Sequence, residues 1–270
     1  MVHLISFDRA AEYYDETRGF PPGVADSVTG SLKSGLHSSD RILELGIGTG
    51  RITIPLIAQK FKVTGIDISR GMMQRLRLNA AKSLVHPPDL IEGDINFLPF
   101  APNSFEIVLA VHVLHLTPTW QVVISEVIRL LTPRGSFIMG YESHPDNTPY
   151  HLIRDQFDAI LFSQGFESRR YVKRDFEEVH QRLLLENAVR EEWVACEWIS
   201  SQTPAQALER IESRKWSSTW NIPETIFRES IDQLRSWVGH TYPDKDLVHF
   251  IPTKFIWRKY SWPDNGQSVN

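Results

Sequence analysis

The chain has 270 residues, of which 41% are hydrophobic and 23% charged, so it can bury a full core and is not a mainly disordered chain. A formal charge of −4 gives no sign of a polyanion partner, and a single cysteine, Cys196, cannot form a disulfide within the chain. The sequence shows neither a secretory signal nor an apolar run near the ~18 residues that cross a membrane. We expect a cytoplasmic protein with no nucleic-acid partner and no membrane insertion; monomer and dimer stay open.

Short strand-like runs alternate with helical patterns through the first half of the chain. Val24, Val28 and Leu32 have helical spacing. Strands are then predicted over 41–45, 62–66, 90–93, 105–111 and 136–141, and helices over 52–60, 70–82 (with Ser69 as N-cap) and 122–131, before Pro133 and Gly135. Such alternation is typical of a doubly wound α/β fold, a parallel sheet with helices on both faces.

The pattern changes after residues 144–147. Helices are predicted over 150–163, 174–184, 204–213 and 224–238, and strands over 189–198 and 247–257. This half shows no obvious core of its own, so we expect its strands to complete the sheet and its helices to form a cap. The predicted organisation is a binding core with its N-terminal segment over 1–144, a helical cap and closing strands of the same domain over 145–262, and a flexible tail over 263–270.

The most informative stretch is the glycine loop, Glu44–Gly50, which follows a predicted strand and opens a helix. Glycines at such a place allow a tight turn and bring a ligand close to the backbone at a helix N-terminus. Asp67 ends the next strand, where an acid can accept hydrogen bonds from both ribose hydroxyls of a nucleoside. The loop therefore indicates either a dinucleotide or S-adenosylmethionine.

Three details favour S-adenosylmethionine. The dinucleotide fingerprint needs a small residue where this chain has Arg51 or Thr53, depending on the glycine from which one counts. Glu44 is unfavourable beside a pyrophosphate but suitable near a sulfonium or an amino group. A third acid, Asp94, follows the third strand and is placed to accept from an adenine amino group.

Five motifs in register between Phe7 and Tyr141 resemble the class I S-adenosylmethionine-dependent methyltransferases. The similar branch acts on small molecules and is related to ubiquinone and menaquinone biosynthesis enzymes. The motifs are Phe7-Asp8-x-x-Ala11-x-x-Tyr14-Asp15-x-x-Arg18, Glu44–Gly50, Gly65–Ser69 with Met72, Gly93-Asp94 followed by Leu98-Pro99-Phe100 and Ser104-Phe105-Glu106, and Glu126-x-x-Arg129-x-Leu131-x-Pro133-x-Gly135. Arg134 replaces a usual glycine and Glu106 a usual aspartate. The resemblance implies a Rossmann-like, mostly parallel seven-stranded sheet with a late helical cap.

The resemblance also implies cofactor contacts, with S-adenosylmethionine as cofactor and S-adenosylhomocysteine as product. It places Gly46, Gly48 and Gly50 at the methionine moiety with Glu44 at its amino group, Asp67 at the ribose, Met72 against the adenine, and Asp94 with the Ile95 backbone at the adenine edge. Tyr14 and Arg18 match positions near the methionyl end, Arg18 as partner of the carboxylate, and Ile68 and Val111 are further candidate cofactor contacts.

His112, after the fourth strand, is our candidate catalytic residue, as a base or as a hydrogen-bond partner of the substrate. A structural role for His112 is an equal alternative. Candidate substrate residues are His115, Tyr141, Arg214 and Trp220, with helix packing as the alternative for His115. No metal site is predicted, because the chain has one cysteine and the His112/His115 pair alone is too small a ligand set.

The functional hypothesis is methyl transfer to a small organic acceptor by in-line displacement. The segment after the fourth strand, Ala-Val-His-Val, lacks the Pro-Pro-aromatic signature of enzymes that methylate a flipped base. Two alternatives stay open at this point: a protein or RNA acceptor, and a non-catalytic protein that binds S-adenosylmethionine. The sequence leaves oxygen, nitrogen and carbon open as the methylated atom.

Overall fold

The computed structural model describes residues 5–167 and 176–262, so the predicted tail 263–270 and the start of the helix predicted from Arg174 lie outside it. The strands are β1 (Arg41–Leu45), β2 (Lys62–Asp67), β3 (Asp89–Glu92), β4 (Phe105–Val111), β5 (Leu131–Ser143), β6 (Val189–Gln202) and β7 (His249–Ser261). The helices are α1 (Tyr14–Arg18), α2 (Val24–Gly30), α3 (Thr53–Ala58), α4 (Arg70–Lys82), α5 (Trp120–Leu130), α6 (Pro149–Ser163), α7 (Glu177–Leu185), α8 (Pro204–Glu212) and α9 (Glu224–Thr241), with 3-10 turns η1 (Asp8–Ala10), η2 (Lys33–Gly35), η3 (Leu114–Leu116) and η4 (Ser217–Thr219).

The strands form one seven-stranded sheet in the order β3-β2-β1-β4-β5-β7-β6. The neighbours from β3 to β5 are parallel. Along β7 and β6, Arg258 pairs with Glu192 and Lys254 with Glu197, so residue numbers fall on one strand as they rise on the other and these two strands are antiparallel. The predicted doubly wound, mostly parallel α/β sheet is confirmed.

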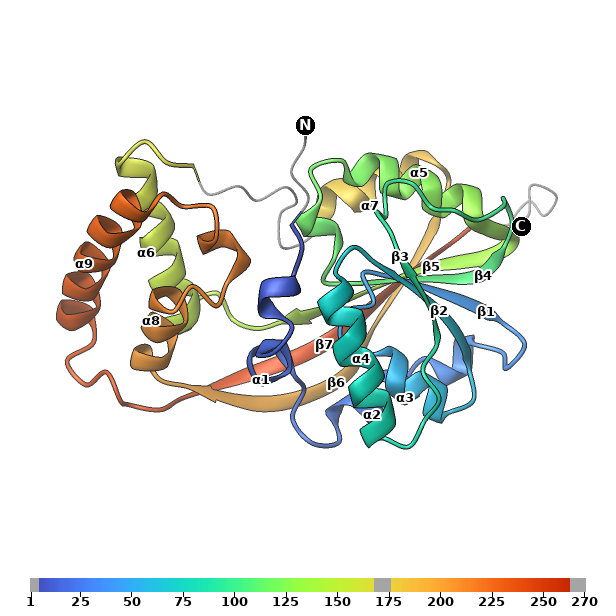
Figure 1. Ribbon diagram of the computed structural model, residues 1–270, viewed down its shortest axis with the longest axis horizontal. Coiled ribbons are helices and arrows are strands. Elements are labelled where there is room, and N and C mark those ends of the chain that lie inside the picture. The colour runs from blue at the N-terminus through green and yellow to red at the C-terminus, as the bar shows by residue number, and fades with distance from the viewer. Residues whose placement is uncertain (1–4, 168–175, 263–270) are drawn as a thin grey trace. The chain divides into compact units, whose positions relative to one another are not determined.

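Helices cover both faces of the parallel part of this sheet, as Figure 1 shows for α2, α3 and α4 on one side and α5 and α7 on the other. Helix α5 shows why: its apolar residues recur at helical spacing, and Val123, Ile124 and Val127 are fully buried. They pack into a core with residues of β1 and β4. This packing fixes the strands, and with them the loops at their carboxyl ends.

The predicted boundary before β5 is wrong. We expected Pro133 and Gly135 to separate helix from strand, but β5 begins at Leu131. Leu131 pairs with Phe105, while the next pair is Ser136 with Ile107, so extra residues of β5 form an irregularity. A proline is tolerated in a strand where it need not donate to the ladder, which is the case at such an irregularity.

The chain divides into two compact units. The first unit comprises 1–142, 171–196 and 255–270, and the second comprises 143–170 and 197–254, each structurally described only within 5–167 and 176–262. Our expectation that the later half has no core of its own is wrong. Helices α6, α8 and α9 of the second unit bury Ile153, Ile211 and Leu234 completely within one cluster. The apolar residues of α6 lie far in sequence from those of α8 and α9. The sequence alone therefore does not show that the three helices share one core. The division into domains stays a prediction.

Candidate functional site

A hollow of about 680 Å³, part of it open solvent, lies in the first unit where the parallel strands end. The strand order reverses here: β2 and β3 are added on one side of β1, and β4 and β5 on the other. Doubly wound sheets bind their ligands at such a point. Of the residues predicted from the sequence, the structure brings the following to this hollow: Tyr14, Gly46, Gly48, Asp67, Ile68, Met72, Asp94, Ile95, Val111 and His112.

The glycine loop forms one wall of the hollow. Gly46 and Gly48 have φ angles of 63° and 56°, the left-handed region that a residue with a Cβ rarely adopts. A Cβ on Gly46 would also lie 2.5 Å from Cγ2 of Val113, another lining residue. The backbone N–H of Gly46 donates to the Ile66 carbonyl at 2.8 Å, which fixes the loop on β2. The loop therefore keeps its backbone bare and close to the hollow.

Asp67 is held firmly at the end of β2. Its Oδ2 accepts from the Gly48 N–H and its Oδ1 from the Ser69 N–H, each at 2.8 Å. Burial raises the pKa of this carboxyl, although the two backbone donors favour its charged form. Each oxygen retains a second acceptor position, and the side chain lines the hollow. This geometry can accept two hydroxyl groups at once.

Asp94 follows β3 and lines the same hollow. Its Oδ1 accepts from the backbone N–H of Asn96 at 2.9 Å and from the Asn96 side chain at 2.7 Å. The Asn96 Oδ1 in turn accepts from the Thr119 hydroxyl at 2.7 Å. The carboxylate is thus oriented by one residue that sequence reasoning did not single out, although it follows the predicted acid by two positions.

Glu44 lies at a smaller hollow of about 300 Å³, which Gly46, Gly48 and Tyr14 also line. Only 3% of Glu44 is exposed, and burial raises the pKa of its carboxyl to about 8. The Thr53 hydroxyl donates to Glu44 Oε2. Burial therefore favours the protonated form of this carboxyl, and a cation bound beside it would favour the charged form.

Sequence reasoning missed Arg51, which lines the smaller hollow together with Glu44. The predicted Arg18 lies exposed at the end of α1 and lines neither hollow; its backbone carbonyl accepts from Arg51 Nη1 at 2.6 Å. The third glycine, Gly50, lines neither hollow and packs near Leu76 and Ile54. The position of Arg51 directly after the glycine loop was the available signal.

His112 has a φ of 52°, the left-handed region, which a non-glycine residue adopts at a cost. Its Nε2 is buried 3.7 Å from Glu142 Oε1, beyond hydrogen-bond distance, and no atom of the described residues hydrogen-bonds to it. Burial lowers the pKa of His112, so the ring is neutral at pH 7. Burial alone would raise the pKa of Glu142, but the Arg51 guanidinium, whose Nη1 lies 2.8 Å from Glu142 Oε1, holds that pKa well below its usual range.

Several further residues line the hollow that were not assigned a role from the sequence. The set is Ile5, Phe7, Gly93, Val113, Leu116 and Thr117. Three of them, Val113, Leu116 and Thr117, lie in the segment after His112. Phe7 begins the first quoted motif, and its ring meets that of Tyr14 edge to face at 5.9 Å. Their spacing resembles ordinary core residues, so the sequence alone could not separate lining from core.

The candidate substrate residues are found in different surroundings. The His115 ring lies 6.5 Å from that of His112, and the Tyr141 hydroxyl accepts from Arg258 at 3.0 Å. Arg214 and Trp220 belong to the second unit, where the Trp220 ring N–H donates to the Arg214 carbonyl at 2.8 Å. A substrate role for these four residues stays a prediction.

Within residues 5–167 and 176–262, no three His, Cys, Asp or Glu side chains are grouped as they would be around a metal ion. No helix in the described ranges is long and apolar enough to cross a membrane.

The fold and the hollow define a class of protein: a doubly wound α/β protein whose glycine loop and strand-end acids suit a nucleoside with an amino-acid moiety. Residues 43–139 match the family model described as "Methyltransferase domain". The resemblance to class I S-adenosylmethionine-dependent methyltransferases, predicted from the five motifs, is therefore confirmed over this segment.

Curated relatives support this assignment over the same half of the chain. The malonyl-[acyl-carrier protein] O-methyltransferase of Halorhodospira halophila is 32% identical over 137 residues, which cover 50% of this chain and 46% of that protein. The demethylmenaquinone methyltransferase of Renibacterium salmoninarum is 28% identical over 160 residues, covering 56% and 63%. The chain thus spans about half to two thirds of the length of these relatives.

Solved structures show the same fold at low sequence identity. A candidate methyltransferase from Bacillus halodurans C-125 aligns with a TM-score of 0.59 and 17% identity, covering 90% of this chain and 100% of that one. Phosphoethanolamine N-methyltransferase 2 of Haemonchus contortus, in complex with phosphomonomethylethanolamine and S-adenosylhomocysteine, aligns with a TM-score of 0.54 and 16% identity, covering 95% and 57%.

Proposed function

We propose that the chain binds S-adenosylmethionine in the hollow of the first unit and transfers its methyl group to a small organic acceptor. The observation that carries the proposal is the pairing of the glycine loop with Asp67: one carboxylate, fixed by the loop's own Gly48 N–H, faces a hollow walled by bare backbone. The relatives named for malonyl-acyl-carrier-protein and demethylmenaquinone methylation support a small acceptor.

The residues around the two hollows fit each part of the cofactor. Asp67 would accept from the ribose hydroxyls, and Asp94 with the Ile95 backbone would bind the adenine edge beside Met72. Glu44 and Arg51 line the smaller hollow together, so an amino acid's ammonium and carboxylate would each find an opposite charge. In this assignment Arg51 takes the part that we first gave to Arg18.

Bound S-adenosylmethionine would supply a methyl group on a positively charged sulfur. A nucleophile in line with the carbon–sulfur bond can take the methyl group, and S-adenosylhomocysteine is the leaving group. The protein's part is to position the two reactants and to exclude water. His112, neutral at pH 7 and facing the hollow, would accept a proton from the nucleophile or orient it. Glu142, 3.7 Å away and negatively charged, would stabilise the imidazolium that forms.

Calorimetric titration of the purified chain tests cofactor binding. We expect saturable binding of S-adenosylhomocysteine and no heat of binding with NAD, because the loop lacks the dinucleotide fingerprint. A chain that binds NAD but not S-adenosylhomocysteine contradicts the proposal.

A labelled-methyl assay separates the acceptor classes. The chain would be incubated with methyl-labelled S-adenosylmethionine and an extract that is then divided into protein, RNA and small-molecule fractions. We expect label in the small-molecule fraction; label in protein or RNA would favour those acceptors, and no label anywhere would favour a non-catalytic binding protein. His112→Gln should then lower the turnover rate by roughly 10²-fold or more while leaving S-adenosylhomocysteine affinity unchanged.

A further inference from the structure

The N-terminal segment 5–18, which we call the cover segment, contributes Ile5, Phe7 and Tyr14 to the lining of the hollow. It contains only the 3-10 turn η1 and the five-residue helix α1. Helices this short do not hold themselves together in water, because nucleation is costly and each turn gains few hydrogen bonds. The segment must therefore be held in place by contacts with the rest of the first unit.

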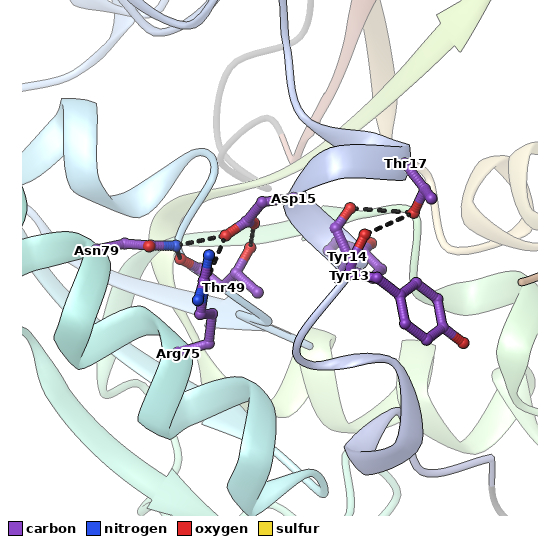
Figure 2. Close-up of polar contacts among 7 residues, drawn as sticks. All are labelled: Tyr13, Tyr14, Asp15, Thr17, Thr49, Arg75 and Asn79. Carbon is purple, nitrogen blue, oxygen red and sulfur yellow. Dashed lines mark hydrogen bonds and ion pairs between the residues drawn. The ribbon is translucent and has the colours of Figure 1, made fainter.

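Several of these contacts gather at Asp15, as Figure 2 shows. Its Oδ1 accepts from the Thr49 hydroxyl of the glycine loop at 2.5 Å. Its Oδ2 accepts from the Asn79 amide at 2.8 Å and from Arg75 Nε at 3.2 Å, both on α4. One carboxylate thus joins three parts of the chain: the cover segment, the glycine loop and α4.

Thr49 is held from two sides. Its hydroxyl donates to Asp15, and its backbone carbonyl accepts from the Asn79 amide at 3.2 Å. Thr49 lies between Gly48 and Gly50 and is only 2% exposed. Loss of the Asp15 hydrogen bonds would therefore remove a contact of the glycine loop as well as contacts of the cover segment.

The other end of the cover segment has a separate anchor. Asp8 Oδ1 accepts from the Ser69 hydroxyl at 2.8 Å and from the Gly71 N–H at 2.7 Å, at the N-terminus of α4. The Gly71 donor holds the pKa of Asp8 below its usual value. Asp8 fixes the start of the segment on α4, whereas Asp15 fixes its end on both α4 and the glycine loop.

We propose that Asp15 is a positioning residue for the cofactor: by binding Thr49, Asn79 and Arg75 it holds Tyr14 against the hollow and shapes the glycine loop at the same time. The inference rests on the proposed cofactor binding. It assigns to Asp15 no contact with the cofactor itself, since Tyr14 and not Asp15 lines the hollow.

Asp15→Asn tests the proposal with almost no change in volume. The amide replaces one acceptor oxygen with a donor, which must face either Thr49 or the Arg75 and Asn79 donors. We expect the Kd for S-adenosylhomocysteine to rise about tenfold, and the amides of residues 13–19 to exchange hydrogen faster in the free protein. Glu12→Gln, an exposed acid on the same segment, is the matched control and should change neither.

A double-mutant cycle with Tyr14→Ala separates positioning from general stability. If Asp15 acts through Tyr14, the loss of affinity in the double variant is smaller than the product of the two single losses. Thr49→Val, which removes the same contact from the other side, should weaken binding severalfold and carries the test if Asp15→Asn does not fold. Provided that the wild-type chain binds S-adenosylhomocysteine, either of two results would overturn the inference. One is unchanged affinity in Asp15→Asn, and the other is a double-mutant cycle in which the two single losses simply multiply. Failure of the unaltered chain to bind contradicts the proposed function itself.

Discussion

The glycine loop Glu44–Gly50 and the aromatic loop 214–222 both have the composition of ligand-binding loops, yet the first lines a hollow and the second packs on its own unit. The glycine loop lines a hollow, and its Gly48 N–H orients Asp67 toward that hollow. In the aromatic loop 214–222 of the second unit, the Arg214 guanidinium stacks on Phe227 at 3.8 Å. It also donates to the Ile222 carbonyl at 3.2 Å and to Glu224 at 2.9 Å.

The difference teaches that residue type alone does not mark a binding loop. Arginine and tryptophan serve equally well to hold a loop onto its own helices, and Trp216 is buried among the residues of α6 and α9. The glycine loop is distinguished by its place at the end of a parallel strand. Gly46 and Gly48 have no side chains there, so their backbone lines the hollow directly. Four predictions test this comparison.

The largest effect is expected from Asp67→Ala. The variant loses the proposed acceptor of both ribose hydroxyls and leaves the Gly48 and Ser69 N–H groups without their partner, so S-adenosylhomocysteine affinity should fall about 100-fold or more. Calorimetry measures the change. Glu92→Gln, at the end of the neighbouring strand and paired with Arg70 at the surface, is the control and should bind normally. Equal affinities in both variants would contradict the ribose assignment.

Arg214→Ala should affect stability and not cofactor binding. It removes the stacking on Phe227 and the hydrogen bonds to the loop, so the free energy of unfolding should fall by about 2–3 kcal/mol. Urea unfolding followed by tryptophan fluorescence measures this loss. Arg228→Ala removes only an exposed pair with the same Glu224 and should cost less than about 0.5 kcal/mol. A large loss of S-adenosylhomocysteine affinity in Arg214→Ala would break the comparison.

The raised pKa of Glu44 predicts that the free energy of unfolding depends on pH. Its pKa in the folded protein is about 8, above the ordinary 4.5, so the folded state binds more protons between these values. The contribution of Glu44 to stability is present below pH 4.5 and is lost as pH rises toward 8, by at most about 1.4 kcal/mol per pH unit. Denaturant melts from pH 5 to 8 should show this slope in the wild type and not in Glu44→Gln. Cofactor binding at pH 7 should release a proton, seen as a dependence of the binding heat on the buffer.

The smallest effect is expected at the opposite end of the same strands. Arg41 and Glu106, at the starts of β1 and β4, form a two-pronged ion pair, and the Arg41 hydrogen bond lowers the pKa of Glu106 to about 2. The pair is partly exposed, so Glu106→Gln should destabilise the fold by less than about 1 kcal/mol and leave cofactor affinity unchanged. The stability that the pair adds at neutral pH would be lost as the pH falls toward 2. A changed affinity would show that the two ends of the sheet are coupled.

Much of the candidate site could be predicted because its signals are local. Glu44, Asp67 and Asp94 each follow a strand, and parallel strands bring their carboxyl ends to one edge. The structure places all three at the two hollows. Arg51 was missed because a residue on the first turn after the glycine loop is equally suited to solvent.

The contacts of the cover segment could not be predicted for a similar reason. Asp15 meets Thr49, Arg75 and Asn79 across 34, 60 and 64 residues of sequence. Each of these residues is an ordinary polar side chain in its own surroundings. The core of the second unit was missed likewise, since α7, β6, α8 and η4 lie between α6 and α9 in the chain.

The sequence by itself determined the order of strands and helices, the glycine loop and the acids at the strand ends, because periodicity and turn chemistry act between near neighbours. Only the tertiary structure decided that Arg51 rather than Arg18 lines the smaller hollow, that Arg214 stacks on Phe227, and that Asp15 joins three segments. Those choices depend on which side chains meet once the helices have packed, and packing is a property of the whole chain.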